Sequence, residues 1–282
     1  MRKLGNVKQL SATAFDLRRD ALDIIMAGGG GHIGGDMSEP EILLTLYERM
    51  NVTPETQASP DRDRFVLSKG HFVETLYAVL SYEGFMNLDE VKAKFSKFGS
   101  EYIGHPHNTL PGIEMNSGSL GHGLSVSVGM ALAGKMDKKN YRVYTLIGDG
   151  ELAEGSVWEG AAAGAHYRLD NLCAIIDHNH LQISGNVDDV LSPGDIGGRF
   201  AASGWNVITV MNGNDIQQIS DALDIAERTK GKPSVIIAET LKGKGSPLME
   251  NKAGWHHKLP NQEEYKQIAA DIAAYKEAIL NG

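Results

Sequence analysis

Two polar residues that could hold a metal ion follow two short apolar segments in the middle of the chain. Asp149 follows the run at residues 142–147, and Asn179 follows the run at residues 171–177. Each run is rich in β-branched residues and a helical pattern separates them, so both polar residues are predicted to emerge side by side at the carboxyl edge of a parallel sheet. Carboxylate and amide oxygens suit a hard cation such as Mg²⁺, which keeps positions open for phosphate oxygens. Because Gly148 and Gly150 let the backbone turn tightly and approach a phosphate closely, the stretch predicts a metal-held diphosphate.

The elements that would position these residues alternate regularly between strand and helix. Strands separated by helices imply parallel pairing, right-handed crossovers and helices on both faces of the sheet. The sequence therefore predicts an α/β fold with an open, mostly parallel sheet, and residues 1–282 are interpreted as a single domain. The expected strands are 64–67, 142–147, 171–177, 206–211 and 234–240, and the expected helices between the last four are about 153–168, 195–203 and 214–229.

Helical patterns in the first half of the chain surround a glycine-rich segment. Residues 11–27 read as an amphipathic helix that ends at the glycine run 28–31. Residues 29–34 formally match a dinucleotide-binding fingerprint, but they follow a helix instead of a strand, so the match is rejected. The segment Ser38-Glu39-Pro40-Glu41 predicts a capping box that begins the next helix. A small-residue helix at 124–135 is expected to be buried or at an interface.

Composition argues against several classes of function. The chain has 27 basic and 36 acidic residues, a net charge of −9, which argues against nucleic acid or an anionic membrane as the main partner. The N-terminus lacks the apolar core of a signal peptide, and no run of about eighteen apolar residues occurs, so a soluble cytoplasmic protein is expected. Cys173 is the only cysteine and is expected to be a buried structural thiol.

Five further motifs accompany the Gly148-Asp149-Gly150 turn and Asn179 in order along the chain. They are Gly31-His32-Ile33-Gly34-Gly35, residues 63–71 ending in Ser68-Lys69-Gly70-His71, Gly104-His105-Pro106, Ser117-Gly118-Ser119-Leu120-Gly121, and Lys242-Gly243-Lys244-Gly245 with Met249-Glu250-Asn251 and Trp255-His256. Together these motifs resemble the N-terminal half of transketolase over nearly the whole chain. The resemblance implies the thiamine-diphosphate-binding fold, in its diphosphate-binding domain, with thiamine diphosphate and Mg²⁺ as cofactors.

The resemblance also implies roles for individual residues. Asp149 and Asn179 would ligate Mg²⁺, or another divalent cation such as Ca²⁺ or Mn²⁺, through their side chains, and Leu181 would do so through its carbonyl. His71 and His256 would lie near the diphosphate. His32 and His105, with His256, are the expected catalytic residues, because imidazole can donate to oxygen and move a proton near neutral pH. The other histidines are interpreted as structural: His107, His122, His166, His178, His180 and His257.

Five more positions match cofactor contacts of the family. Gly118 and Leu120 would contact the aminopyrimidine ring, through a backbone carbonyl and by packing respectively, and Ser119 and Gly150 are assigned to cofactor binding with them. Glu154 would reach across a subunit interface toward the glutamate that activates the cofactor. The structural alternatives are a simple turn before a helix at Gly118, and for Glu154 a solvated acid near a helix N-terminus.

The resemblance implies a missing half as well. A full transketolase continues through a pyrimidine-binding domain, which supplies the activating glutamate, and a C-terminal domain. The chain is therefore expected to be the N-terminal subunit of a split transketolase, inactive alone and assembled into an α2β2 complex with a separate C-terminal subunit. It would transfer a two-carbon ketol unit between sugar phosphates, as in the pentose phosphate pathway. The alternatives are a subunit of another thiamine-diphosphate enzyme, acting on a 2-oxoacid or an unusual ketose phosphate, and a non-catalytic cofactor-binding regulatory module.

Overall fold

A five-stranded parallel sheet lies at the centre of the computed structural model, which describes residues 1–282. The strand order is β1-β2-β3-β7-β6. All five predicted strands are confirmed, with boundaries that differ by one residue or so. The strands are β1 (Arg64–Leu67), β2 (Val143–Gly148), β3 (Leu172–His178), β6 (Asn206–Val210) and β7 (Ser234–Glu239). A two-stranded antiparallel hairpin, β4 (Leu181–Gln182) with β5 (Gly185–Asn186), was not predicted and follows β3 directly.

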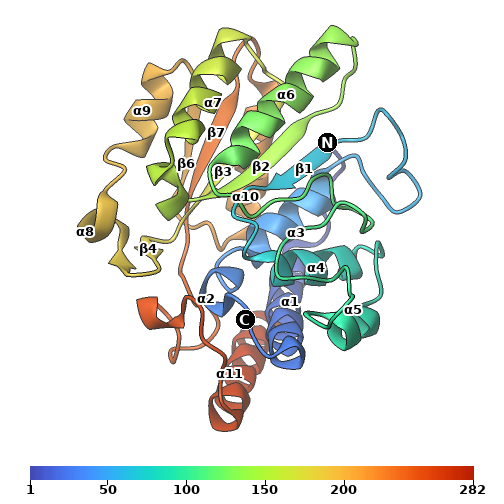
Figure 1. The fold of residues 1–282 in the computed structure, drawn as a ribbon, viewed down its shortest axis with the longest axis vertical. Coiled ribbons are helices and arrows are strands. Elements are labelled where there is room, and N and C mark those ends of the chain that lie inside the picture. The colour runs from blue at the N-terminus through green and yellow to red at the C-terminus, as the bar shows by residue number, and fades with distance from the viewer.

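Helices cover both faces of this sheet, as predicted. Figure 1 shows α6, α7 and α9 together in the upper part of the molecule, and α1, α4, α5 and α11 gathered in its lower part. The α-helices are α1 (Val7–Gly28), α2 (Ile33–Asp36), α3 (Pro40–Arg49), α4 (Val73–Tyr82), α5 (Leu88–Lys94), α6 (His122–Met136), α7 (Gly155–His166), α8 (Val187–Leu191), α9 (Ile196–Ala202), α10 (Ile216–Arg228) and α11 (Gln262–Asn281). Two short 3₁₀ helices, η1 (Gly150–Ala153) and η2 (Ala253–Trp255), lie in the connections.

The alternation of side chains along each strand divides the core in two. In β2, Tyr144 and Leu146 point into a cluster built with α1, α3, α4 and α10, whereas Val143 and Ile147 join a cluster with α6, α7 and α9. Both faces of the strand are therefore apolar, as expected of a parallel sheet that is covered on both sides. Fully burying one such aliphatic side chain contributes about 1.5–3 kcal/mol, so the central strands and the residues at their ends are held firmly.

A third cluster joins the two ends of the chain. Phe15 and Ile25 of α1 pack against Ile268 and Ile272 of α11, and Trp255 of η2 packs into the same cluster. The helix α11 begins with a complete capping box, in which Asn261 accepts from Glu264 N at 2.9 Å and the Glu264 side chain accepts from Asn261 N. The packing brings η2, and with it the segment that carries His256, back to the start of the chain.

The predicted capping box at the start of α3 is wrong. Glu39 occupies the N-cap position and makes no side-chain capping bond. The Ser38 hydroxyl oxygen instead lies 2.7 Å from both Gly35 O and Asp177 Oδ2, and its one proton can be donated to either acceptor. Glu41 forms a buried ion pair with Arg18, at 2.6 Å between Nη2 and Oε2, so it does not reach back to the helix start. Tertiary partners for both side chains override the local pattern.

Two further expectations can be compared with the structure. Cys173 is fully buried in β3, as predicted. The predicted small-residue helix is α6; it packs on α7 and on β2, while Ser125, Gly129 and Ala133 remain exposed on its outer side. Its role at an interface stays a prediction. No helix of the chain combines the length and the apolar character that crossing a membrane requires.

Candidate cofactor-binding site

Asp149 and Asn179 lie next to each other at the carboxyl edge of the sheet, as predicted. The strands β2 and β3 are hydrogen-bonded neighbours in which Gly148 lies opposite Asp177. Asp149 follows the end of β2 and its N–H donates to Asp177 O at 3.3 Å, while Asn179 directly follows β3. Both side chains are buried, with 2% and 3% of their surface exposed. Two oxygen-bearing side chains therefore converge at one point of a rigid edge.

The Asp149 carboxylate is held by backbone groups. Its Oδ1 accepts from Gly150 N at 2.7 Å and its Oδ2 accepts from His180 N at 2.5 Å. Burial, together with the nearby Asp177 charge, raises the pKa of Asp149 above its usual range. A divalent cation in front of this carboxylate would counter both effects, because opposite charge favours the ionised form.

The Asn179 amide is oriented by Asp177. Its Nδ2 donates to Asp177 Oδ2 at 3.0 Å, so its Oδ1 points the other way, where it accepts from Leu181 N at 3.2 Å. Because a carbonyl oxygen has two lone pairs, Oδ1 keeps one of them available for a cation. The donor set of one carboxylate oxygen and one amide oxygen thus fits a hard cation such as Mg²⁺, with room for phosphate oxygens in the remaining positions.

The carbonyl of Leu181, the third predicted metal ligand, already accepts a hydrogen bond from a lysine. Lys242 Nζ donates to Leu181 O at 2.8 Å and lies 3.0 Å from His256 Nδ1. Burial lowers the pKa of Lys242 to about 8, against the opposing effect of Asp149 and Asp177. The ammonium group therefore shares the neighbourhood of these carboxylates, and a metal ion bound to Leu181 O would take the place of the lysine contact.

A cavity of about 230 Å³ collects most of the predicted residues. Nine of the twelve predicted site residues line it: His32, His71, Gly118, Leu120, Asp149, Gly150, Asn179, Leu181 and His256. They come from segments spread over more than two hundred residues of sequence. Gly148, predicted to help the backbone approach a phosphate, lines it too, and the residues without a predicted role are Lys69, Phe72, Glu151, Gln182, Ile183 and Lys242.

Three histidines form one wall of this cavity. The ring centroid of His32 lies 5.0 Å from that of His71 and 5.5 Å from that of His256, and those two are also 5.5 Å apart. Burial is the main cause that lowers the pKa of all three, to about 4 for His32 and about 3 for His256. They are therefore neutral at pH 7, and each imidazole can offer one N–H donor and one acceptor.

Three predicted residues lie outside the cavity. His105 borders an adjoining hollow with His32, His257 and Glu74, and it lies against the Gly118 backbone. Ser119 is exposed and its hydroxyl contacts His122 Nδ1 at 3.2 Å. Glu154 is exposed at the start of α7. The structure thus leaves Ser119 and Glu154 turned toward the surface of the chain.

A buried polar network supports the cavity from beneath. Lys69 Nζ lies 2.8 Å from Glu39 Oε2 and also bonds Asp177, and the Thr240 hydroxyl donates to the same Asp177. Burial alone would raise the pKa of Asp177, but the Lys69 ammonium lowers it below its usual range. Asp177 therefore stays charged and fixes Asn179. The sequence did not predict this network, although Lys69 lies within the motif Ser68-Lys69-Gly70-His71.

Glu151 and His257 also escaped the sequence reasoning. The Glu151 carboxylate accepts from Gly121 N at 2.7 Å and from Gly148 N at 3.0 Å, and it bonds the Ser68 hydroxyl. One buried acid thereby ties together three segments around the site. His257, interpreted as structural, has its ring centroid 4.5 Å from that of His32. Its position directly after His256, a predicted catalytic residue, is the sequence feature that could have indicated its place near the cavity.

Asp36 and Glu74 form a buried acid pair under the glycine-rich loop. Thr75 N donates to Asp36 Oδ1 at 2.9 Å, but Asp36 Oδ2 and both Glu74 oxygens have no other donor. Burial raises the pKa of both acids, and the pair is satisfied when Glu74 carries a proton and donates it to Asp36. An added Cβ at Gly31 would lie 2.4 Å from Glu74 Oε1, so this acid supports the loop directly.

Glu74→Gln is expected to weaken the pH dependence of stability. A raised pKa means that the folded state holds a proton that the unfolded state releases above about pH 4, so the free energy of unfolding falls as pH rises toward neutrality. Glutamine supplies a permanent N–H donor to Asp36. The variant should therefore melt about 2–4 °C higher than the wild type near pH 8, with a smaller difference near pH 5. Thermal unfolding monitored by circular dichroism measures the melting temperature at each pH, with the exposed Glu277→Gln as control. If the melting temperatures of Glu74→Gln and the wild type changed in parallel with pH, Glu74 would not share a proton with Asp36.

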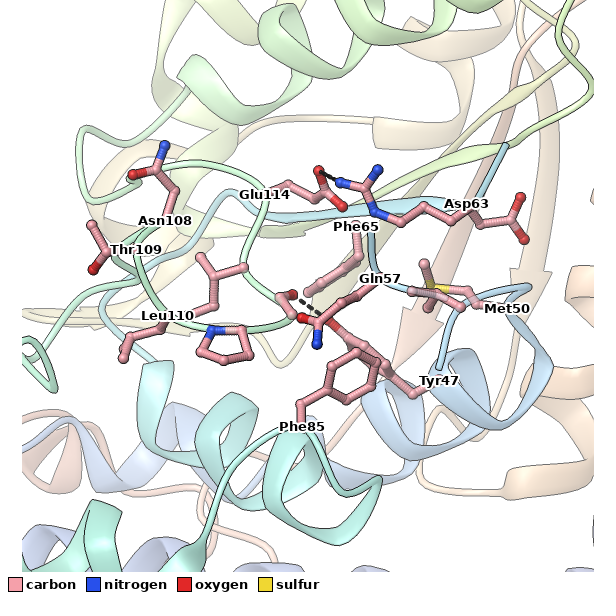
Figure 2. Close-up of a pocket in the computed structure, with 15 residues that line it drawn as sticks. Tyr47, Met50, Gln57, Asp63, Phe65, Phe85, Asn108, Thr109, Leu110 and Glu114 are labelled. Carbon is pink, nitrogen blue, oxygen red and sulfur yellow. Dashed lines mark hydrogen bonds and ion pairs between the residues drawn. The ribbon is translucent and has the colours of Figure 1, made fainter. Parts of the chain in front are cut away.

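A second cavity, of about 330 Å³, is lined by residues of α3 and β1 and by residues 108–114 (Figure 2). Its walls include Tyr47, Phe65 and Phe85, and an ion pair of 2.8 Å joins Arg62 to Glu114 beside it. None of the predicted site residues lines it. It is larger than the cavity at the sheet edge but lacks a converging set of metal ligands or histidines, so the chemistry belongs to the smaller one.

Comparisons with known proteins agree on the family. Residues 10–275 match the family model described as "Transketolase, thiamine diphosphate binding domain". One of the subunits of the apulose-4-phosphate transketolase of Phocaeicola vulgatus is 46% identical over 268 residues, which cover 95% of each chain. A 6-deoxy-6-sulfo-D-fructose transketolase subunit of a Clostridium species is 38% identical, over 91% of this chain and 93% of its own length.

Solved structures give the same picture at the level of the fold. The transketolase of Campylobacter jejuni superimposes with a TM-score of 0.89 at 29% identity, over 98% of this chain but only 46% of its own. The chain therefore spans less than half the length of that enzyme and nearly the whole length of the relatives that are named as subunits. The sheet edge, the histidine wall and these matches lead to one conclusion: the chain belongs to the transketolase family, in its thiamine diphosphate-binding domain.

Proposed function

We propose that this chain is the N-terminal, cofactor-binding subunit of a two-chain transketolase. It holds thiamine diphosphate through a divalent cation, with Mg²⁺ as the metal that fits the donor set. With a separate C-terminal subunit it transfers a two-carbon ketol unit from a ketose phosphate to an aldose phosphate. Catalysis takes place in the assembled enzyme, for which an α2β2 arrangement would bring both kinds of chain to each site.

One observation carries this proposal above the others. The Asp149 carboxylate and the Asn179 amide converge at adjacent strand ends, in the same cavity as the neutral imidazoles of His32, His71 and His256. Oxygen ligands for a cation and N–H donors for phosphate or hydroxyl oxygens are both required to hold a diphosphate beside a sugar. A non-catalytic module has no need of the histidine wall, so the catalytic role is favoured.

Each group in the cavity has a task that its own chemistry supports. When bound, thiamine diphosphate supplies the electron sink for cleavage beside a carbonyl. Asp149 and Asn179 hold the cation that neutralises the diphosphate, and Asp177 keeps the Asn179 oxygen aimed at it. His71 and His256 donate N–H groups to oxygens. His32, the central ring of the cluster, and His105 in the adjoining hollow are placed to exchange protons with substrate hydroxyls.

The donor is proposed to be a ketose phosphate rather than a 2-oxoacid. Two relatives of similar length carry names that specify ketose substrates outside the common pentose and hexose phosphates, namely apulose 4-phosphate and 6-deoxy-6-sulfo-D-fructose. An unusual ketose phosphate is therefore a specific second candidate beside xylulose 5-phosphate. Turnover of the assembled enzyme with a panel of ketose phosphates and with pyruvate distinguishes these donors, and a preference for pyruvate would overturn the proposal.

The isolated chain is expected to be inactive. The family takes the activating glutamate from the pyrimidine-binding domain, and Glu154, the residue proposed to meet it, is exposed and forms no ion pair within the chain. With saturating thiamine diphosphate and Mg²⁺, the purified chain should show no ketol transfer, and adding the C-terminal subunit should restore it by at least about 1,000-fold, a size typical for loss of an essential catalytic group. A coupled assay of aldose product measures both.

Two outcomes would count against the proposal. Turnover by the chain alone at an enzymatic rate would remove the need for a second subunit. An assembled complex that binds the cofactor but turns over no ketose would instead support the regulatory module. Glu154→Gln in the complex, with the exposed Glu277→Gln as matched control, tests the interface role: only the first is expected to lower the rate.

A further inference from the structure

Outside the cofactor cavity, one cluster of side chains has the composition of a metal site. It comprises His178, His180 and Glu239 at the carboxyl edge of the sheet. The Nδ1 atom of His178 lies 2.7 Å from Glu239 Oε1, and Nε2 of His180 lies 2.8 Å from Glu239 Oε2. One ligand atom from each residue lies within 4.8 Å of the others, and the two imidazole ring centroids are 4.0 Å apart.

The fold itself brings these three residues together. The neighbouring parallel strands β3 and β7 pair in a register that places His178 directly opposite Glu239. His180 reaches the same carboxylate because its backbone takes a left-handed conformation, with φ of 65°. This conformation is uncommon for a residue with a side chain, and it is held by the hydrogen bond from His180 N to Asp149. The cluster is therefore assembled by strand ends, which are rigid, and by one fixed turn.

We propose that His178, His180 and Glu239 form a binding site for a transition-metal ion such as Zn²⁺ or Co²⁺, separate from the magnesium site of the cofactor. Two imidazoles and one carboxylate suit these ions, whereas Mg²⁺ prefers oxygen ligands alone. Ligand atoms about 2.1 Å from a shared tetrahedral ion lie roughly 3.4 Å apart, so the nitrogen–oxygen separations of 2.7 and 2.8 Å would each widen by about 0.6–0.7 Å. An ion would replace the protons that now bridge the carboxylate to the two rings.

The site is open on one side. The side chain of His180 is 49% exposed, that of Glu239 is 30% exposed and that of His178 is 20% exposed. An ion bound here would keep at least one position for water, which is the arrangement of open metal sites. Its location is also specific: Asn179 lies between the two histidines in sequence, and His180 N bonds Asp149. The transition-metal ion would thus tie β3 to β7 and stiffen the loop that carries a ligand of the cofactor metal.

Titration of the full-length, chelator-treated chain with Co²⁺ tests this site. Calorimetry and the visible absorption of bound Co²⁺ are expected to show one ion per chain, with nitrogen ligands, in the presence of a large excess of Mg²⁺. Glu239→Gln and His180→Asn should each weaken Co²⁺ binding by roughly 100-fold, the upper end of the effects seen when a metal site loses a supporting group. Asparagine is chosen because it tolerates the left-handed backbone of position 180.

Two control variants separate this site from its surroundings. The exposed His166→Ala and His122→Ala, two histidines outside the cluster, should both bind Co²⁺ as the wild type does. Circular dichroism confirms that each variant is folded. Unchanged Co²⁺ affinity in both Glu239→Gln and His180→Asn would overturn the proposal, as would displacement of Co²⁺ by Mg²⁺.

Discussion

Asp149→Asn is expected to weaken thiamine diphosphate binding in the assembled enzyme by roughly 100-fold, or about 2.7 kcal/mol. The side chain loses its negative charge, so it no longer attracts a divalent cation to the edge of β2. The one remaining oxygen also cannot serve both backbone donors, Gly150 N and His180 N, that the carboxylate now accepts from. Cofactor affinity at saturating Mg²⁺, followed by quenching of intrinsic fluorescence, gives the number.

The metal assignment has a sharper test than affinity alone. Removing Mg²⁺ from the wild type should cost about as much as the substitution, whereas removing it from Asp149→Asn should cost almost nothing, because the two changes act on the same interaction. Asp221→Asn, an exposed acid on α10, is the matched control and should behave as the wild type. A variant that kept the full Mg²⁺ dependence would remove Asp149 from the ligand set.

Lys69→Met is expected to lower the free energy of unfolding by about 3–5 kcal/mol. Lys69 is fully buried between Glu39 and Asp177, and both carboxylates would lose the ammonium group that pairs with them directly. Methionine fills a similar volume, so the loss comes from uncompensated charge and not from a cavity. The melting temperature should fall by roughly 10 °C, as measured by thermal unfolding at neutral pH.

The cause of that loss can be isolated with a second substitution. Adding Glu39→Gln to Lys69→Met removes one of the two uncompensated carboxylates and should recover part of the lost stability. Lys94→Met breaks an exposed pair with Glu90 of 2.6 Å and serves as control, with an expected effect within about 0.5 kcal/mol. If Lys69→Met were as mild as Lys94→Met, the buried network would not be a source of stability.

The sheet and the metal ligands could be predicted because they rest on local patterns. Apolar runs of strand length, separated by helical periodicity, determine where β2 and β3 end, and the end of a parallel strand fixes which residues meet there. The predicted positions of Asp149 and Asn179 required no further information. The histidine wall required the family resemblance, since the packing of α1, α2 and η2 brings His32 and His256 together, and His71 joins them from the segment between β1 and α4.

The supporting network could not be predicted from sequence for a physical reason. Lys69 and Asp177 are 108 residues apart, and nothing in either segment specifies the other as its partner. The Ser38 hydroxyl matched a capping pattern but bonds Asp177 across the fold, whereas Asn261 and Glu264, with an equally simple pattern, do form a capping box. A local pattern is reliable where no distant partner competes for the same side chain.

The buried Lys242, which lies beside the proposed metal ligands, affects the charge of the site when no cofactor is bound. Lys242 already supplies a positive charge next to Asp149 and contacts the Leu181 carbonyl, so the acidic edge is neutralised before any cofactor arrives. Binding of a divalent cation would then replace one positive charge next to Asp149 with another. A chain with such an internal counter-ion is expected to stay folded without the cofactor, because the charge of Asp149 is already compensated.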